Sequence, residues 1–319
     1  AINAKYDVFK DGKATALGTI DNINKIEEPR YVKVNSKVDD YNNAGNYEIN
    51  EIRSINSGAN DIIVFEYEIE RAYNVSGFVQ IVTIPQYDDV VIQNTLTCQA
   101  WNGSFGGILT FNATGTVTLN ADIDVSGKGF RGGLAEDIGG QVCFGGFGYT
   151  GFNCDYTLEC GAPKGEGIGN KYETLELARS PNANGGGGGN DHNAGGGGGG
   201  AFGLGGLGGD RTNGSCNGFG GLKGRDLNYN TDNKIMLSGA GGAGDAGNLA
   251  GALGGTSGGN AGGTIFISAG NIISNGNNII ADGETVTSLA IGDGAGAGGA
   301  GGLIILDINS YNDVLNIES

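Results

Sequence analysis

The sequence predicts an all-β protein in which coils like those of a parallel β-helix, or solenoid, carry a bundle of extended glycine-rich strands of the polyglycine type. Three observations favour this class. Of the 319 residues, 66 are glycine, and they are concentrated between residues 183 and 302. Short runs rich in β-branched residues interrupt that tract at 264–268 and 303–306. Finally, one segment of the chain repeats, which is typical of stacked architectures.

Residues 1–100 have the pattern of an ordinary β region. Apolar and polar residues alternate at 31–35, 61–67 and 77–84, and Asn, Gly, Asp and Pro bound these segments. Helical periodicity is scarce along the chain. We therefore predict a β-rich N-terminal region over 1–100 and a glycine-rich β-solenoid region over 101–319.

The repeat defines the second region. Residues 106–127 align, with one gap, with residues 262–283, and a third copy begins at residue 301. Each copy is predicted to contain a strand of four or five residues, a tight turn and two further short strands. A repeat of about 22 residues suits one coil of a solenoid. The insertion over 134–261 would form a glycine-rich layer beside the coils.

Two interpretations of the glycine tract are open. A flexible linker is the simpler one, because glycine loses the most backbone entropy on ordering. Residues that prefer burial nevertheless recur in the tract, and they favour ordered packing. They are Phe202, Leu204, Leu207, Phe219, Leu222, Leu249 and Leu253. Since glycine has no Cβ, extended strands with a three-residue repeat can also lie unusually close together.

Charge and hydropathy restrict the partners. A formal net charge of −17 and a pI near 4.3 oppose binding to nucleic acid or to an anionic membrane surface, whereas calcium or a neutral glycan fits. No stretch approaches the roughly 18 apolar residues of a membrane-spanning segment. Residues 1–20 lack the pattern of a signal peptide, so we expect any secretion signal to lie upstream of this chain.

Five cysteines are present, and an odd number leaves at least one outside any pairing within the chain. Cys143, Cys154, Cys160 and Cys216 are the candidates for disulfides. Zinc binding is less favoured, because the spacings contain no C-x-x-C pair. Disulfides would fit an oxidising compartment.

Candidate ligand contacts fall in two places. The first is a polar turn inside the glycine tract, which consists of Asn190, Asp191, His192 and Asn193 and includes the only histidine. Its alternative role is to satisfy backbone groups through side-chain hydrogen bonds. The second is the aromatic group of the cysteine-rich loop, which could stack on sugars or pack against the scaffold. Its members are Phe147, Tyr149, Phe152 and Tyr156.

Catalytic and metal-binding patterns are weak. A G-x-G-x-x-G match at 239–244 and a G-x-S-x-G match at 255–259 lack the required strand-to-helix context, and both are expected by chance in a glycine-rich chain. Acidic pairs such as Asp122 with Asp124 are typical of a solvated face, so we predict no metal ligands and no cofactor, with calcium the one ion left open. Lys128 and Arg131 near Asp124 are the only candidates for polysaccharide-degrading chemistry, and we predict that the chain is not an enzyme.

A set of motifs in order resembles a known family. Over most of the chain from about residue 40, it resembles the glycine-rich N-terminal region of giant cell-surface adhesins of Bacteroidetes, the gliding-motility type exported by type IX secretion. The segments that carry the resemblance are 41–50, 77–85, 100–103, 106–109, 119–133, 164–168 and 185–200. The cysteines depart from the family's pattern, and the loop over 134–163 is variable.

The resemblance implies a secreted, non-catalytic adhesion module displayed outside the cell on a bacterial surface, as a fragment of a much longer polypeptide. Its partners would be an extracellular surface or glycan and proteins of the type IX secretion and motility machinery. An alternative of a different class is a docking or assembly module for that machinery. A third, least favoured, is a polysaccharide-degrading β-helix enzyme.

Overall fold

The computed structural model describes residues 8–9, 20–21, 30–37, 44–56, 62–71, 73, 78–135, 161–169, 177–190, 193–210, 220–227, 234–246 and 254–319. Every regular element in these ranges is a β-strand, and none of the ranges contains a helix. The prediction of an all-β protein is therefore confirmed. It follows that no helix in the described ranges is long and apolar enough to cross a membrane.

The N-terminal strands form a five-stranded sheet in the order β1-β6-β3-β4-β5, with all pairs antiparallel. Its strands are β1 (Val8–Phe9), β3 (Arg30–Lys37), β4 (Tyr47–Asn56), β5 (Ile62–Phe65) and β6 (Phe78–Ile84). The alternation seen in the sequence produces this sheet: in β6 the buried side chains Gln80, Val82 and Ile84 occupy every second position. The strands predicted at 31–35, 61–67 and 77–84 correspond to β3, β5 and β6.

A six-stranded sheet lies beside it, in the order β13-β11-β9-β8-β2, with β7 also paired to β9. Its strands are β2 (Ile20–Asp21), β7 (Gln86–Tyr87), β8 (Val90–Ile92), β9 (Ile108–Leu119), β11 (Thr264–Ile273) and β13 (Leu303–Asn312). The three copies of the repeat supply β9, β11 and β13, which run parallel and in register, so that Thr264 lies opposite both Ile108 and Leu303.

Each repeat continues into a second short strand. These strands are β10 (Ile123–Asp124), β12 (Asn278–Ile280) and β14 (Asn316–Glu318), and they form a parallel three-stranded sheet. In the six-stranded sheet every pair is parallel except β2 with β8, and we call the two sheets together the parallel stack. Between them lies a core in which Leu109 and Phe111 pack with Ile265, Ile267 and Ile279, all almost fully buried. Rows of apolar side chains at equivalent positions of successive copies therefore hold the stack together.

One detail of the repeat differs from the prediction. Instead of a strand of four or five residues and a tight turn, the first copy forms the single 12-residue strand β9. The expected turn is reduced to an irregularity in the pairing of β9 with β11, between Ala269 and Asn271. Gly270 lies there, and a Cβ on it would crowd the carbonyl oxygens of residues 114 and 115. A bulge at a glycine thus replaces the turn.

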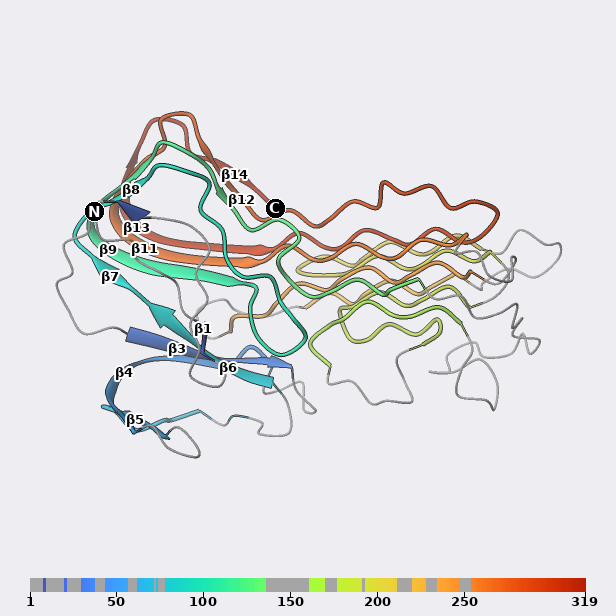
Figure 1. Ribbon diagram of the computed structural model, residues 1–319, viewed down its shortest axis with the longest axis horizontal. Helices are drawn as coiled ribbons and strands as arrows, with labels where there is room; N and C mark the ends of the chain where they lie inside the picture. The colour runs from blue at the N-terminus through green and yellow to red at the C-terminus, as the bar shows by residue number, and fades with distance from the viewer. Residues whose placement is uncertain are drawn as a thin grey trace.

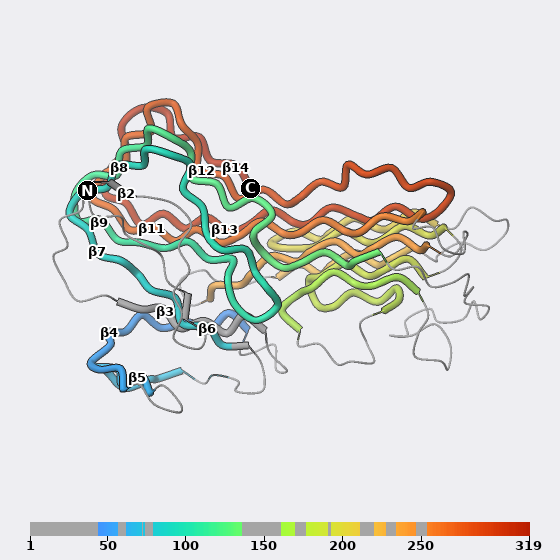
Figure 2. Tube along the Cα trace, viewed as in Figure 1, coloured from blue at the N-terminus to red at the C-terminus, as the bar shows by residue number. Residues whose placement is uncertain are grey.

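The glycine-rich segments run side by side away from the sheets, to the right in Figure 1 and Figure 2. We call them the glycine-rich bundle; they comprise residues 129–135, 161–168, 185–190, 194–210, 220–227, 239–246, 254–262 and 282–302. The end near the sheets is the inner end and the far end is the outer end. The bundle makes the molecule long in one direction.

Hydrogen bonds of the bundle follow a three-residue cycle. Successive amides of residues 195–200 donate in turn to segments 203–210, 294–299 and 184–190, and then the order repeats. The bonds run from Gly195 to Gly209, Gly196 to Ala295, Gly197 to Gly187, Gly198 to Gly206, Gly199 to Gly298 and Gly200 to Asn184. Segment 195–200 therefore donates hydrogen bonds on three sides, unlike a strand of a flat sheet, which bonds on two.

Glycine is required by the spacing of these segments. A Cβ on Gly187 would overlap the carbonyl oxygen of Arg179, and a Cβ on Gly188 would overlap that of Ala162. Main-chain atoms of neighbouring segments occupy the space that side chains fill elsewhere. The bundle is consequently ordered by backbone hydrogen bonds.

Three of the large apolar residues of the tract do not have the predicted role, whereas Leu222 is partly buried. Phe202, Leu204 and Leu207 are more than half exposed, at 56%, 53% and 68%. Because the interior is filled by glycine backbone, their side chains project outward. The expectation that they are buried is wrong for these three, whereas Phe219, Leu249 and Leu253 lie outside the described residues.

Candidate functional site

The outer end of the bundle gathers the ends of several glycine-rich segments. The amide of Asp245 donates to the carbonyl oxygen of Ala194, and the amide of Gly294 donates to that of Asp245. Close by, the amide of Gly189 donates to Ala243. Segments that are far apart in the sequence therefore terminate together, on a support made almost entirely of hydrogen-bonded backbone.

Two residues of the predicted polar turn are described at this end. Asn190 is only 5% exposed, so its side chain does not face solvent, and its buried Oδ1 has no hydrogen-bond partner among the described residues. Asn193 is partly buried and has a φ of 64°, a left-handed conformation that asparagine tolerates better than most residues. Asp191 and His192, between them, lie outside the described residues.

The other predicted contacts also fall outside the described ranges. They are Phe147, Tyr149, Phe152 and Tyr156 of the cysteine-rich loop, together with the disulfide candidates Cys143, Cys154, Cys160 and Cys216. The chain on either side of the loop is described: Ala135 donates its amide to Oγ of Ser257 at 2.9 Å, and Ala162 donates its amide to Gly189. Both flanks of the loop are thus anchored in the bundle.

The fifth cysteine has a different environment. Cys98 is a free thiol, buried among the core residues of the parallel stack. Burial raises the pKa of this thiol to about 12, which keeps it protonated and unreactive at neutral pH. Among the described residues no group of three His, Cys, Asp or Glu side chains is placed to hold a metal ion.

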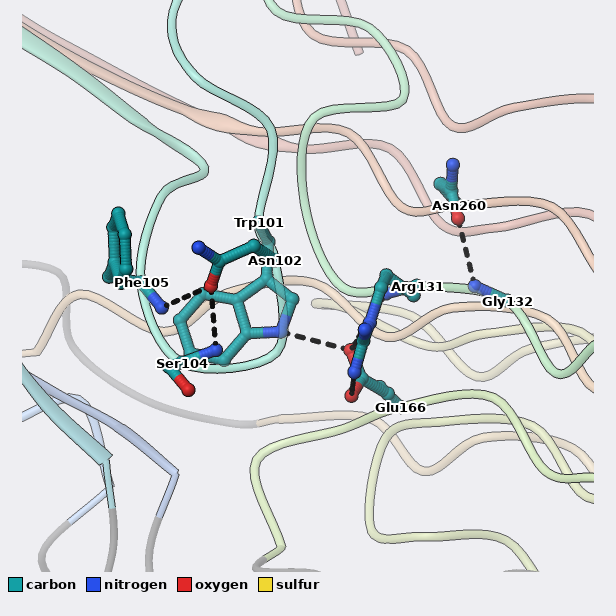
Figure 3. Close-up of polar contacts among 8 residues, drawn as sticks. All are labelled: Trp101, Asn102, Ser104, Phe105, Arg131, Gly132, Glu166 and Asn260. Atoms are coloured by element: carbon teal, nitrogen blue, oxygen red, sulfur yellow. Dashed lines mark hydrogen bonds and ion pairs between the residues drawn. The ribbon is translucent and has the colours of Figure 1, made fainter. Parts of the chain in front are cut away.

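A buried carboxylate joins the sheets to the inner end of the bundle (Figure 3). Glu166 is 3% exposed, and its Oε2 accepts hydrogen bonds from Nε1 of Trp101 at 2.9 Å and from the amide of Arg131 at 3.0 Å. Its Oε1 accepts from Nη2 of Arg131 at 2.8 Å. Trp101 also makes an edge-on contact with Phe130, with ring centroids 5.3 Å apart.

The sequence did not reveal this group, because its members lie far apart along the chain. Glu166 follows Trp101 by 65 positions and Arg131 by 35. The loop after Trp101 is fixed as well: Oδ1 of Asn102 accepts from the amides of Ser104 and Phe105 at 3.0 and 3.1 Å (Figure 3). Both carboxylate oxygens of Glu166 accept hydrogen bonds, so this group has a structural role. We call Trp101, Arg131 and Glu166 together the clamp.

Two of the residues considered for polysaccharide-degrading chemistry, Arg131 and Asp124, have separate partners. Arg131 pairs with Glu166, and Oδ1 of Asp124 accepts from the amide of Ser126 at 2.8 Å, as in a turn. A buried lysine nearby, Lys164, has its pKa lowered to about 8 by burial. None of these contacts assembles an acid and a base around a common open space.

The chain was compared with known proteins by family, sequence and structure. No family model, no curated protein and no solved structure matches it significantly. The resemblance to surface adhesins therefore stays a prediction that depends on the motifs of the sequence alone.

Proposed function

We propose that this chain is a non-catalytic adhesion module of a bacterial cell surface, which attaches to external surfaces or polysaccharides, in the manner of gliding-motility adhesins exported by type IX secretion. The observation that supports the proposal most is the backbone hydrogen bonding that links the segments of the glycine-rich bundle, with segment 195–200 bonded on three sides. It holds the ends of many segments together, far from the sheets, on a backbone framework. A pre-ordered support loses little entropy when residues at its end bind.

The finer architecture belongs to the same proposal. The in-register pairing of β9, β11 and β13, with β10, β12 and β14 following in the same order, supports solenoid-like coils. Each coil would consist of a long strand, a turn, a short strand and a glycine-rich excursion into the bundle. The three-residue cycle of hydrogen bonds supports strands of the polyglycine type.

Attachment can be tested with beads that carry the purified chain. We expect such beads to be retained under flow on polysaccharide-coated glass, and the double variant Phe147→Ala, Tyr149→Ala to release them at lower shear. Phe202→Ala, which alters an exposed aromatic residue of the bundle, is the matched control. Retention no better than that of albumin-coated beads on every coating would refute the adhesion function.

A docking or assembly module is the second candidate, and one observation favours it. At the open end of the parallel stack, the exposed side chains of Tyr311, Val314 and Ile317 border a hollow of about 560 Å³. Apolar patches of this kind mark interaction surfaces. This candidate predicts no retention on any polysaccharide, but association with a component of the secretion or motility machinery that Val314→Lys abolishes.

A further inference from the structure

A small cleft separates the N-terminal sheet from the parallel stack. Its volume is about 180 Å³. Residues of six strands line it, and they divide into an apolar wall and a polar wall. The apolar wall contains Ile49 of β4, Ile84 of β6 and Phe266 of β11, whereas the polar wall contains Gln86, Asn112, Ser268 and Asp307.

The polar wall is a ladder that crosses four strands at one level. Gln86 of β7 lies opposite Asn112 of β9, which lies opposite Ser268 of β11, which lies opposite Asp307 of β13. Nδ2 of Asn112 donates to Oε1 of Gln86 at 2.7 Å, and Oγ of Ser268 donates to Oδ2 of Asp307 at 3.4 Å. Amide, hydroxyl and carboxylate groups therefore stand in a row with hydrogen-bonding capacity left over.

A further hydroxyl belongs to Thr110, which also lines the cleft. Thr110 is 1% exposed, and its Oγ1 has no hydrogen-bond partner. An unpaired buried hydroxyl costs free energy, which a hydrogen bond to a ligand in the cleft would offset. Thr264 has the same defect, with a buried Oγ1 that lacks a partner, but it does not line the cleft.

Charge and size define what the cleft would accept. Asp307 is the one charged residue among those that line it, and none of them is basic, which disfavours anions such as phosphates and acidic sugars. The volume is below the roughly 300 Å³ at which pockets for drug-sized ligands begin. A ligand with one apolar face and several hydroxyl groups, no larger than a single ring, matches both walls.

We propose that this inter-sheet cleft is a binding site for one neutral sugar unit, a terminal or projecting residue of a glycan. The C–H face of the ring would contact Ile49 and Phe266, and its hydroxyls would bond to Asn112, Ser268 and Asp307. This inference rests on the proposed adhesion function for its class of ligand, and it adds a site remote from the outer end of the bundle.

The test uses the full chain and simple methyl glycosides of glucose, galactose, mannose and N-acetylglucosamine, with glucuronic acid and N-acetylneuraminic acid as anionic comparisons. Binding is followed by saturation-transfer NMR and by titration. We expect at least one neutral glycoside to bind with a Kd on the order of 1 mM, and the two acids to bind more weakly.

Two pairs of variants locate the binding. Ser268→Val places methyl groups in the cleft, and its control Ser310→Val removes a comparable hydroxyl, bonded to Asn271 at 2.9 Å, outside the cleft. Thr110→Val removes the unpaired hydroxyl at constant volume, and Thr264→Val is its control. We expect Ser268→Val to weaken binding of the neutral glycoside by at least roughly tenfold, and Thr110→Val to weaken it by about three- to tenfold. The two control variants should bind it as the native chain does.

The possible failures are distinguishable. If no neutral glycoside binds, or if both cleft variants bind it as their controls do, the cleft proposal is wrong. Retention of beads on polysaccharide would then still stand as evidence for adhesion through another surface. If a glycoside binds in the cleft and beads are nevertheless not retained on any surface, the sugar site stands and the adhesion function falls.

Discussion

In the parallel stack, Leu109 and Ile265 fill the space between two sheets, whereas in the glycine-rich bundle the backbone of neighbouring segments occupies the equivalent space. The stack thus depends on the burial of apolar side chains. The bundle depends on main-chain hydrogen bonds in three directions and on the absence of side chains. The two regions should therefore respond in opposite ways to the same kinds of substitution.

The largest effect is expected from adding a single methyl group to the interior of the bundle. In Gly187→Ala the new Cβ would overlap the backbone of Arg179, which no side-chain rearrangement relieves, so we expect a loss of more than about 4 kcal/mol in the free energy of unfolding. Gly206, where a Cβ would meet nothing within 4 Å, is the control, and Gly206→Ala should change stability by less than about 0.5 kcal/mol. Urea unfolding followed by the fluorescence of the single tryptophan measures both; equal midpoints would contradict the close packing of the bundle.

Removing a large apolar side chain should destabilise the parallel stack much more than the bundle. Leu109→Ala leaves a cavity in the stack and should cost roughly 3 kcal/mol. Leu207→Ala, in the bundle, removes a side chain that is 68% exposed and should cost less than about 0.5 kcal/mol. Thermal unfolding of the two variants compares them, and a large loss for Leu207→Ala would mean that the bundle also relies on side-chain burial.

The clamp between the two regions should have an intermediate effect. Glu166→Gln keeps the shape of the side chain but removes the negative charge that accepts hydrogen bonds from Trp101 and Arg131. We expect the free energy of unfolding to fall by about 2 kcal/mol. Glu68→Gln, at an exposed position, is the control. If urea unfolding shows equal stability for the two variants, the clamp does not contribute to the junction.

A pH effect should be the smallest. Because burial raises the pKa of the Cys98 thiol to about 12, the folded chain keeps the proton that an unfolded thiol loses near pH ~8.5. The contribution of this group is complete below that pH and is lost as the pH rises toward 12, by about 1 kcal/mol between pH ~8.5 and ~9.5. The difference in stability between the native chain and Cys98→Ala should shrink accordingly, and a difference that is constant with pH would contradict it.

Much of the parallel stack could be predicted from the sequence, but the contact of Glu166 with Trp101 and Arg131 could not. The repeat at 106–127 and 262–283 predicted correctly which segments are equivalent, because identical patterns bury the same positions in each copy. It did not predict that β9 would continue past Gly115, since a bulge and a turn demand similar residues. Glu166 was not singled out, because its burial depends on two partners brought close only by the fold.

Part of the outer end of the bundle could be predicted from the sequence. The polar residues of the turn at 190–193 were recognisable as a break between glycine segments. The burial of Asn190 could not be predicted, because it depends on how neighbouring segments end around this residue. For the same reason Phe202 and Leu204 were misjudged: composition suggests burial, while only the hydrogen-bond geometry shows that the interior has no room for them.

The pairing of β9 with β11 has a consequence for how the chain folds. These strands lie side by side in register, yet segment 120–263, which contains most of the bundle, separates them along the chain. Their alignment must therefore close a very long loop, which is entropically costly and slow unless that loop is already compact. We expect the bundle to collapse first and bring the second copy of the repeat back to the first, so that folding kinetics would be limited by the glycine-rich segments rather than by the sheets.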